Sequence, residues 1–287
     1  MRRQVRLIRL NIFMYCLHTI SKPDRHTILR WLCILCVFSW GAASVCAAGT
    51  EARIRDAGQL RVCIWPEYYG VTFRNPHTRA LSGIDIDLSH ALATDLGVDL
   101  VYIDSSFRTL VEDLLSGRCE IAMFAIAAIA PRAQLLAFST PYMQSGIYAI
   151  TTKGQRQIKY WDDIDRPGVV VGVQAGSFME PIMLDSLKQA SVVVVRPPMN
   201  REKELLSGRI DVFMTDYPNG RRVLDRNDAI RLISPDTHRE VMPYAYAIKP
   251  GDQQWLNRVN QFVDAIKRDG RLERAAQQHG MAPMVVR

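Results

Sequence analysis

Beyond its first 48 residues, the sequence has few of the side chains that build metal centres. Only Cys63, Cys119 and four histidines lie there, and no histidine stands at ligand spacing to another histidine or to a cysteine. Structural zinc sites need such closely spaced pairs. The sequence also shows no Ser/His/Asp or Cys/His arrangement of the kind used in nucleophilic catalysis. We therefore expect no metal site and no cofactor.

Excess charge is also scarce in the body of the chain. The formal net charge is +7, but seven of the 36 Lys/Arg and one of the 29 Asp/Glu fall in the first 48 residues, which leaves +1 for the rest. Binding to nucleic acid would need concentrated positive charge. The near-neutral remainder gives no support to a nucleic-acid partner.

Long apolar runs are limited to one, "WLCILCVFSWGAASVC" at residues 31–46, which follows a basic region and precedes small residues. This order is typical of a secretory signal peptide, and cleavage after Ala47 or Ala48 fits the small-residue rule. We expect residues 1–48 to be a signal peptide and the protein to be periplasmic. An uncleaved membrane anchor is the alternative, and the long basic region leaves open a start at Met14.

The two cysteines outside this leader suggest one disulfide, because exported proteins meet oxidising conditions. Cys63 lies in the strand-like run "LRVCI" and Cys119 begins the run "CEIAMFA", so neighbouring parallel strands would bring them close. A register offset would leave their Cα atoms too far apart. A disulfide and two separate buried thiols are both compatible with the sequence.

Strand and helix patterns alternate from residue 60 onward. Apolar runs at 60–65, 98–103 and 119–126 predict strands, and helical spacing at 84–97 and 107–117 predicts helices between them. Such βαβαβ order indicates a parallel α/β sheet with helices on both faces.

The same order restarts further along the chain. The second block has strands at 168–174, 191–196 and 210–216, with helices at 176–189 and 200–208; a returning strand at 242–250 and helices at 253–270 and 271–280 follow. We expect an α/β fold of two lobes, each a parallel-rich sheet flanked by helices. Lobe 1 would comprise residues 49–147 and 245–287, lobe 2 residues 148–244, and two extended hinge strands would join them.

Two charged residues stand just past strand ends, where α/β lobes bind small molecules. Arg132 is the single charged side chain in residues 121–152, and Asp216 ends the run "IDVFMTD" of the second block. A buried charge without a partner is costly. Arg132 therefore reaches solvent, pairs with a protein carboxylate or binds a ligand. Opposite charges from opposite lobes would grip a zwitterion.

Six segments carry a family resemblance. In chain order they are "LRVCIWPEYY", "GIDIDLSHALATDLGV", "FRTLVEDLLSGRCEIAM", "PRAQLLAFSTPY", "VGVQAGSF" and "LLSGRIDVFMTD". From residue 60 to about residue 280, the chain resembles the bacterial solute-binding proteins of family 3, the periplasmic amino-acid receptors of ABC importers. The resemblance implies a two-lobed periplasmic-binding-protein fold of type II that closes on an amino acid or organic acid. It also implies an inner-membrane ABC permease as partner, a monomeric protein and no enzyme activity.

The resemblance also implies roles for single residues. Arg132 takes the place of the arginine that pairs with the ligand's α-carboxylate, and Asp216 that of the acid that receives the α-ammonium. Tyr68 and Phe107 match aromatic positions of the pocket wall, and Ser177 matches a contact at the start of a lobe 2 helix, whose free N–H groups would favour an anion. Asp216 can alternatively serve as a helix N-cap.

The sequence departs from the family at several positions. Ala127 and Ile129 stand where the family has Thr or Ser, and Trp65 stands at a frequently acidic position near Tyr68. We expect Ala127 and Trp65 to belong to the binding site and to make it more apolar. The ligand would then be apolar or aromatic in part, or not an α-amino acid. The pair "RR" at positions 221 and 222 is expected on a solvated helix face.

Two other functions are compatible with the resemblance. Periplasmic cyclohexadienyl dehydratases also resemble the chain, including its phrase "DRPGV" at 165–169. In that branch an acid three residues after the aspartate of "TD" carries the proton chemistry, and here Asn219 occupies the position. An amide cannot act as a general acid, so we expect a non-enzyme. The other alternative is a sensor or accessory subunit of a signalling or redox system.

Overall fold

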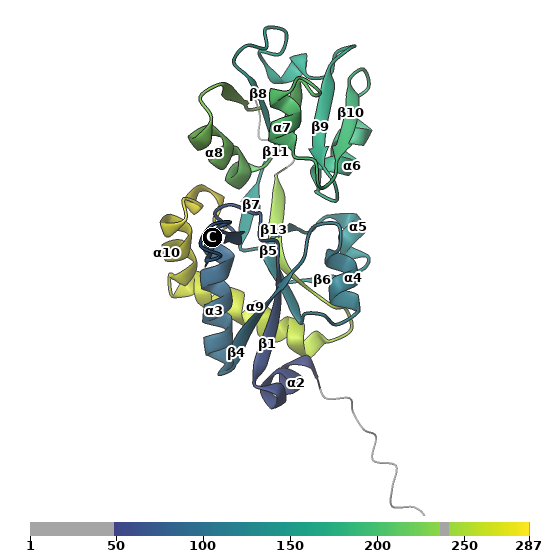
Figure 1. Cartoon of the computed structure of the whole chain (residues 1–287). Coiled ribbons are helices and arrows are strands. Elements are labelled where there is room, and N and C mark those ends of the chain that lie inside the picture. The colour runs from purple at the N-terminus through teal and green to yellow at the C-terminus, as the bar shows by residue number, and fades with distance from the viewer. Residues whose placement is uncertain (1–48, 236–240, 287) are drawn as a thin grey trace, which may run out of the picture. The chain divides into compact units, whose positions relative to one another are not determined.

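The two sequence blocks form two separate β-sheets within one compact unit, Ala48–Arg287. The structure, a computed structural model, describes residues 49–235 and 241–286 (Figure 1). The predicted signal peptide lies outside the described residues. None of the described helices is long and apolar enough to cross a membrane.

The first sheet has a parallel centre and an antiparallel side. β1 pairs in parallel with β4 and β5, whereas β13 runs antiparallel to β5, β6 and β7. Every residue of β5 is buried, as expected for a strand covered on both faces. The strands, in spatial order, are β4 (Asp99–Asp104), β1 (Gln59–Ile64), β5 (Ile121–Ala127), β13 (Met242–Ile248) and β6 (Ala137–Phe138), with β7 (Met143–Ser145) also on β13.

Helices cover this sheet on both sides. α3 and α10 pack against each other, and Figure 1 shows α4 and α5 on the opposite side of the sheet. α3 ends at a left-handed Gly97, as the sequence predicts. The helices of this part are α2 (Thr50–Ala57), α3 (Ile84–Leu96), α4 (Leu110–Leu115), α5 (Ala130–Ala133), α9 (Gln253–Arg268), α10 (Arg271–Gln278) and the short η2 (Ala282–Met284). A small hairpin joins β2 (Phe73–Arg74) to β3 (Leu81–Ser82).

The second sheet repeats the plan of the first. β9 pairs in parallel with β10 and β11, and β8 runs antiparallel to β11 and β12. Its strands, in spatial order, are β10 (Ser191–Val195), β9 (Val170–Gln174), β11 (Val212–Thr215), β8 (Tyr148–Thr152) and β12 (Ile230–Ile233). Its helices are η1 (Trp161–Asp163), α6 (Met179–Ser186), α7 (Arg201–Leu206) and α8 (Tyr217–Arg226).

The chain passes between the two sheets twice. Gly146 and Ile147 connect β7 of the first sheet to β8 of the second, and the return runs from β12 to β13. The first connection leads directly into β8, and β13 begins at Met242. The expected fold class, two lobes joined by two hinge strands, is therefore correct.

A disulfide joins Cys63 and Cys119, with 5.6 Å between their Cα atoms. Cys63 lies in β1, and Cys119 precedes the neighbouring strand β5 by two residues. Because Val62 pairs with Ile121, the offset between the two strands is small enough for the bond. The disulfide is confirmed, and the alternative of two separate thiols is wrong.

A carboxylate is buried in the core beneath the first turn of α3. Asp85 accepts hydrogen bonds from the hydroxyls of Tyr142 (2.6 Å) and Tyr246 (3.3 Å) and from the backbone N–H of Ala125 (2.9 Å). Ala125 has φ +49° and lies where the pairing of β5 with β13 shifts register, so its N–H turns to the carboxylate. Burial raises the pKa of Asp85 to about 7, although the three donors oppose this.

Candidate ligand-binding site

Arg132 is buried between loops of the two lobes. Pro131 lies in the first turn of the short helix α5, and Arg132 is only 7 % exposed. Its Nη1 donates to the carbonyl of Ala127 at 3.0 Å, and its Nη2 donates to the carbonyl of Gly176, from the second lobe, at 2.5 Å. Among the described residues, no carboxylate forms an ion pair with it. Burial lowers the pKa of Arg132 to about 10.

Asp216 is buried at the start of α8 and binds groups from both lobes. Its Oδ1 accepts the N–H of Asn219 at 3.3 Å, so it is an N-cap, as the alternative interpretation proposed. Its Oδ2 accepts the hydroxyls of Tyr68 and, at 3.2 Å, Tyr244. Burial, followed by the charge of Asp216, raises the pKa of both tyrosines well above the ordinary value. Both hydroxyls therefore stay protonated and able to donate.

Three aromatic rings from the first lobe stand beside these charges. The ring centroid of Trp65 lies 5.1 Å from that of Tyr68 and 5.0 Å from that of Phe107. The guanidinium carbon of Arg132 lies 5.2 Å from the Phe107 centroid, a cation–π contact. Ala127 contributes its carbonyl to Arg132 rather than a side-chain hydroxyl. Five of the seven predicted residues thus form one cluster around Arg132, and Asp216 joins it through Tyr68.

The loop before α6 differs from the prediction. α6 begins at Met179, and the N–H groups expected to be free are occupied: that of Gly176 donates to Glu180 Oε2 (2.6 Å) and that of Ser177 to the carbonyl of Gln174 (3.1 Å). In the structure, protein acceptors therefore occupy the N–H groups at which an anion was expected. The hydroxyl of Ser177, in contrast, is buried without a hydrogen-bond partner among the described residues.

Gly176 allows the two lobes to approach closely at this loop. Its φ is +73°, a conformation that favours glycine. A Cβ at this position would lie 3.0 Å from backbone atoms of Phe107 and Arg108 in the first lobe. The carbonyl of Gly176 reaches Arg132 because no side chain separates the two loops.

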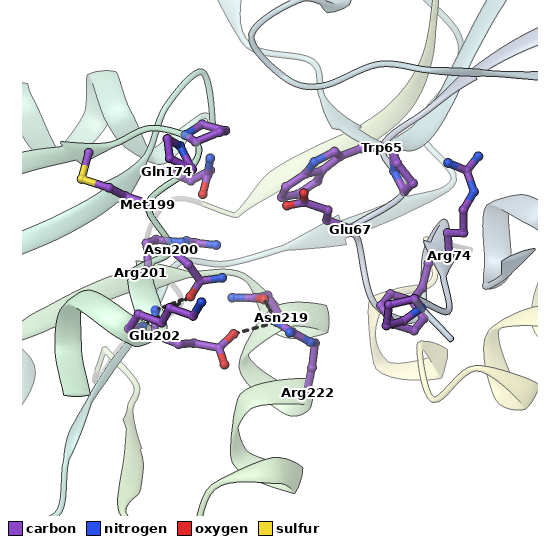
Figure 2. Close-up of a pocket in the computed structure, with 16 residues that line it drawn as sticks. Trp65, Glu67, Arg74, Gln174, Met199, Asn200, Arg201, Glu202, Asn219 and Arg222 are labelled. Atoms are coloured by element: carbon purple, nitrogen blue, oxygen red, sulfur yellow. Dashed lines mark hydrogen bonds and ion pairs between the residues drawn. The ribbon is translucent and has the colours of Figure 1, made fainter. Parts of the chain in front are cut away.

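A cavity of about 400 Å³ lies next to this cluster and is lined by both lobes. Figure 2 shows Trp65 and Glu67 on one wall, facing Gln174, Arg201 and Asn219. Its lining is rich in charged and amide side chains, and Trp65 is the one predicted site residue that lines it. A smaller cavity of about 170 Å³ adjoins Trp65 and Phe107. Arg132 and Asp216 line neither cavity.

Arg222, expected in a solvated pair, instead lines the larger cavity. Its side chain is 20 % exposed, and its Nη1 lies 2.6 Å from Glu202 Oε1. Arg221 beside it is exposed, as expected. Tyr244 and Arg201 were not among the predicted site residues. The alternation of "MPYAYAI", which places Tyr244 and Tyr246 on one side of a strand, is a signal for the former.

The sequence of the two lobes matches that of a known protein family. Residues 60–282 match the sequence model of the bacterial extracellular solute-binding proteins, family 3. The chain belongs to this family. The predicted resemblance is therefore confirmed, and with it the two-lobed type II fold.

The curated relatives of this chain include binding proteins and an enzyme. The chain is 27 % identical over 253 residues to a cyclohexadienyl dehydratase of Pseudomonas aeruginosa, covering 88 % of the chain and 92 % of that protein. It is 24 % identical over 251 residues to the L-cystine-binding protein TcyJ of Escherichia coli, covering 87 % and 92 %. Family 3 membership thus indicates a small-molecule-binding protein and does not by itself exclude an enzyme.

Solved structures of the family have the same fold. An ancestral amino-acid-binding protein, a precursor of cyclohexadienyl dehydratase, superposes with a TM-score of 0.73 at 28 % identity, over 80 % of this chain and 99 % of that one. An amino acid ABC transporter substrate-binding protein from Streptococcus pneumoniae, bound to L-arginine, gives a TM-score of 0.73 at 24 % identity, over 80 % and 98 %. The second likeness concerns the fold alone.

Proposed function

We propose that this family 3 protein is a periplasmic receptor that captures a small carboxylate, such as an amino acid, and delivers it to an ABC permease. The observation that carries the proposal is the burial of Arg132 without a carboxylate partner among the described residues. A guanidinium binds a carboxylate through two parallel hydrogen bonds, which two carbonyls only partly replace. The missing counter-ion is the ligand.

The contacts within the cluster support a way in which a ligand can bind. Arg132 Nη2 and Asp216 Oδ2 are each held by a group from the opposite lobe, namely the Gly176 carbonyl and the Tyr68 hydroxyl. A ligand carboxylate takes the place of that carbonyl, and a ligand ammonium takes the place of that hydroxyl. Because the ligand then contacts both lobes, it favours the closed arrangement over an open one.

The amide side chain of Asn219 supports delivery of the ligand without a chemical reaction. Its Nδ2 donates to Thr215 Oγ1 at 2.9 Å and its Oδ1 lies 3.4 Å from Arg222 Nη1, so the amide serves as a fixed hydrogen-bonding group. An amide cannot give or take the proton that a dehydration requires. The Pseudomonas relative nevertheless makes a dehydratase the second candidate. Glu67, exposed at the cavity wall, is the carboxylate that it would need.

Calorimetric titration and thermal melting of the purified protein with amino acids, organic acids and amines test the proposal. A ligand present at a hundred times its dissociation constant stabilises the folded state by about 2.7 kcal/mol. Binding of a carboxylate that is recovered unchanged supports the receptor. Conversion of a cyclohexadienyl carboxylate to an aromatic product, lost in Glu67→Gln, establishes the dehydratase instead. Absence of any binding contradicts both.

The partner is tested separately. Ligand-loaded receptor should stimulate ATP hydrolysis by an ABC permease reconstituted from the same cell, and the ligand-free form should stimulate it less. If the loaded protein binds a kinase or a redox enzyme and not a permease, the sensor or accessory role replaces transport.

A further inference from the structure

Two buried side-chain atoms lack a hydrogen-bond partner in the described part of the chain, and both lie at the junction of the lobes. They are Ser177 Oγ and Arg222 Nε. Buried polar groups nearly always have a partner, so such atoms beside a cavity indicate a missing ligand or water. Ser177 belongs to the predicted site. Arg222 does not, and it lines the larger cavity.

The cavity offers a second guanidinium without a counter-ion. Arg201 donates from Nη1 to the carbonyl of Met214 at 2.5 Å, and its guanidinium carbon lies 5.4 Å from the Phe213 ring centroid. No carboxylate pairs with it among the described residues. Burial lowers the pKa of Arg201, while the nearby charges of Asp216 and Glu202 oppose the effect. This charge would gain from an anion in the cavity.

The other charged side chains of the cavity do not supply a carboxylate partner for Arg201. Arg74 is neutralised by Asp104, outside the lining, and Glu202 occupies only Nη1 of Arg222. A guanidinium has five N–H donors, and Glu202 is the one carboxylate that pairs with Arg222 among the described residues, so one ion pair leaves most of its donors without an acid. Glu67 stands on the opposite wall (Figure 2) and is exposed, where water screens its charge. The wall formed by the second lobe is therefore the one that attracts anions.

Asn219 connects this wall to the predicted site. Its backbone N–H binds Asp216 Oδ1, and its side-chain Oδ1 faces Arg222 Nη1. Asp216 of the predicted site and Arg222 of the cavity wall are thus both bonded to the same residue. The two sites together suit one ligand with charge at both ends.

We propose that Arg201 and Arg222 bind a second carboxylate of the ligand, so that the receptor takes dicarboxylates such as acidic amino acids. This inference rests on the proposed receptor function and names its ligand class. It replaces the expectation of an apolar or aromatic ligand with one of a doubly anionic ligand.

Calorimetric titration with matched acid and amide pairs tests the inference. L-Glutamate and L-glutamine, or L-aspartate and L-asparagine, have nearly the same shape and differ in the distal charge. We expect each acid to bind at least about tenfold more tightly than its amide. Arg222→Gln should remove most of this preference. Arg222→Lys, which keeps the charge facing Glu202 and loses the Nε donor, should remove part of it. Arg221→Gln, on the exposed neighbour, should keep it.

The outcomes separate the two proposals. Equal or tighter binding of the amides or of other neutral ligands overturns the second carboxylate and leaves the receptor function intact. An acid preference that survives in a folded Arg222→Gln protein also overturns it, because the anion then binds elsewhere. Failure of every amino acid and organic acid to bind overturns the receptor function and this inference with it.

Discussion

The Nη2 atom of Arg132 lies 2.5 Å from the carbonyl oxygen of Gly176, so a side chain of the first lobe binds the backbone of the second. The hydroxyl of Tyr68 makes the corresponding contact to Asp216. Each of these protein groups occupies a position that a charged end of an amino acid can take. In the proposed receptor, a ligand would therefore compete with contacts that the protein makes to itself.

Replacing Arg132 by alanine should weaken binding of the carboxylate ligand by about 100-fold or more. Each hydrogen bond to a charged group contributes about 1.5–3 kcal/mol, and a carboxylate receives two from this side chain. Calorimetric titration measures the loss. Arg156→Ala, on an exposed arginine of the second lobe, is the matched control and should bind normally. Wild-type affinity in a folded Arg132→Ala protein would contradict the assigned role.

Tyr68→Phe should destabilise the ligand-free protein by about 1.5–3 kcal/mol, since Asp216 loses one of its two tyrosine hydroxyls in a buried position. Chemical denaturation without ligand measures the effect. Saturating ligand should reduce the difference, because a ligand ammonium replaces the hydroxyl. Tyr69→Phe is the control: this neighbouring ring packs on Phe73, and its hydroxyl makes no hydrogen bond among the described residues. An equal loss in both variants would show that the contact to Asp216 is unimportant.

Asp85 should make the stability of the protein depend on pH. Its pKa is about 7 in the folded state, against an ordinary value of 3.8, so between about pH 4 and pH 7 the folded state binds more protons than the unfolded state. The contribution of this group to the free energy of unfolding is therefore complete at low pH and falls as the pH rises through that window. Asp85→Asn cannot ionise and still reaches Tyr142 and Ala125.

Denaturation of the wild type and Asp85→Asn from pH 4 to pH 8 provides the measurement. As the pH rises from about 4 to about 7, the free energy of unfolding of Asp85→Asn should increase relative to that of the wild type, by on the order of a few kcal/mol. Asp56→Asn, on an exposed aspartate of α2, should run parallel to the wild type. A constant difference between wild type and Asp85→Asn would place the pKa of Asp85 outside this range.

Loss of the disulfide should lower the free energy of unfolding by about 4 kcal/mol, as loop closure predicts for a sequence separation of 56. Urea denaturation with and without reductant measures the change. The Cys63→Ala, Cys119→Ala double variant should match the reduced wild type and should not respond to reductant. Identical curves for oxidised and reduced wild type would mean that the bond adds nothing.

Hydrophobic periodicity predicted the parallel strands of both sheets and the helices between them. The strand at 119–126 and the helix at 84–97 appear as β5 and α3 within two residues at each end. These elements are covered by the core, so their apolar spacing reflects the fold directly. The start of α6 was misplaced, because Gly176 and Ser177 form a turn whose hydrogen bonds depend on Glu180 and Gln174 rather than on local propensity.

The binding cluster was predictable only where a residue stands just past a strand. Arg132 and Asp216 both do, and their burial follows from the strands before them. Tyr244 comes from a distant strand, and its contact to Asp216 exists only once the second sheet has folded back on the first. Arg222 and Arg221 are adjacent in sequence, but a helix turns them about 100° apart, so one faces the cavity and the other faces solvent.

Tyr244 and Tyr246 stand two positions apart on β13, and their hydroxyls bind Asp216 and Asp85. Side chains at such spacing lie on one face of a strand, and a slip by one residue would turn both away. Sliding of β13 along its neighbouring strands would therefore remove hydrogen-bond donors from both Asp216 and Asp85. Separation of the lobes would break the contact of Tyr244 to Asp216, which belongs to the second lobe, and keep that of Tyr246 to Asp85, which belongs to the first.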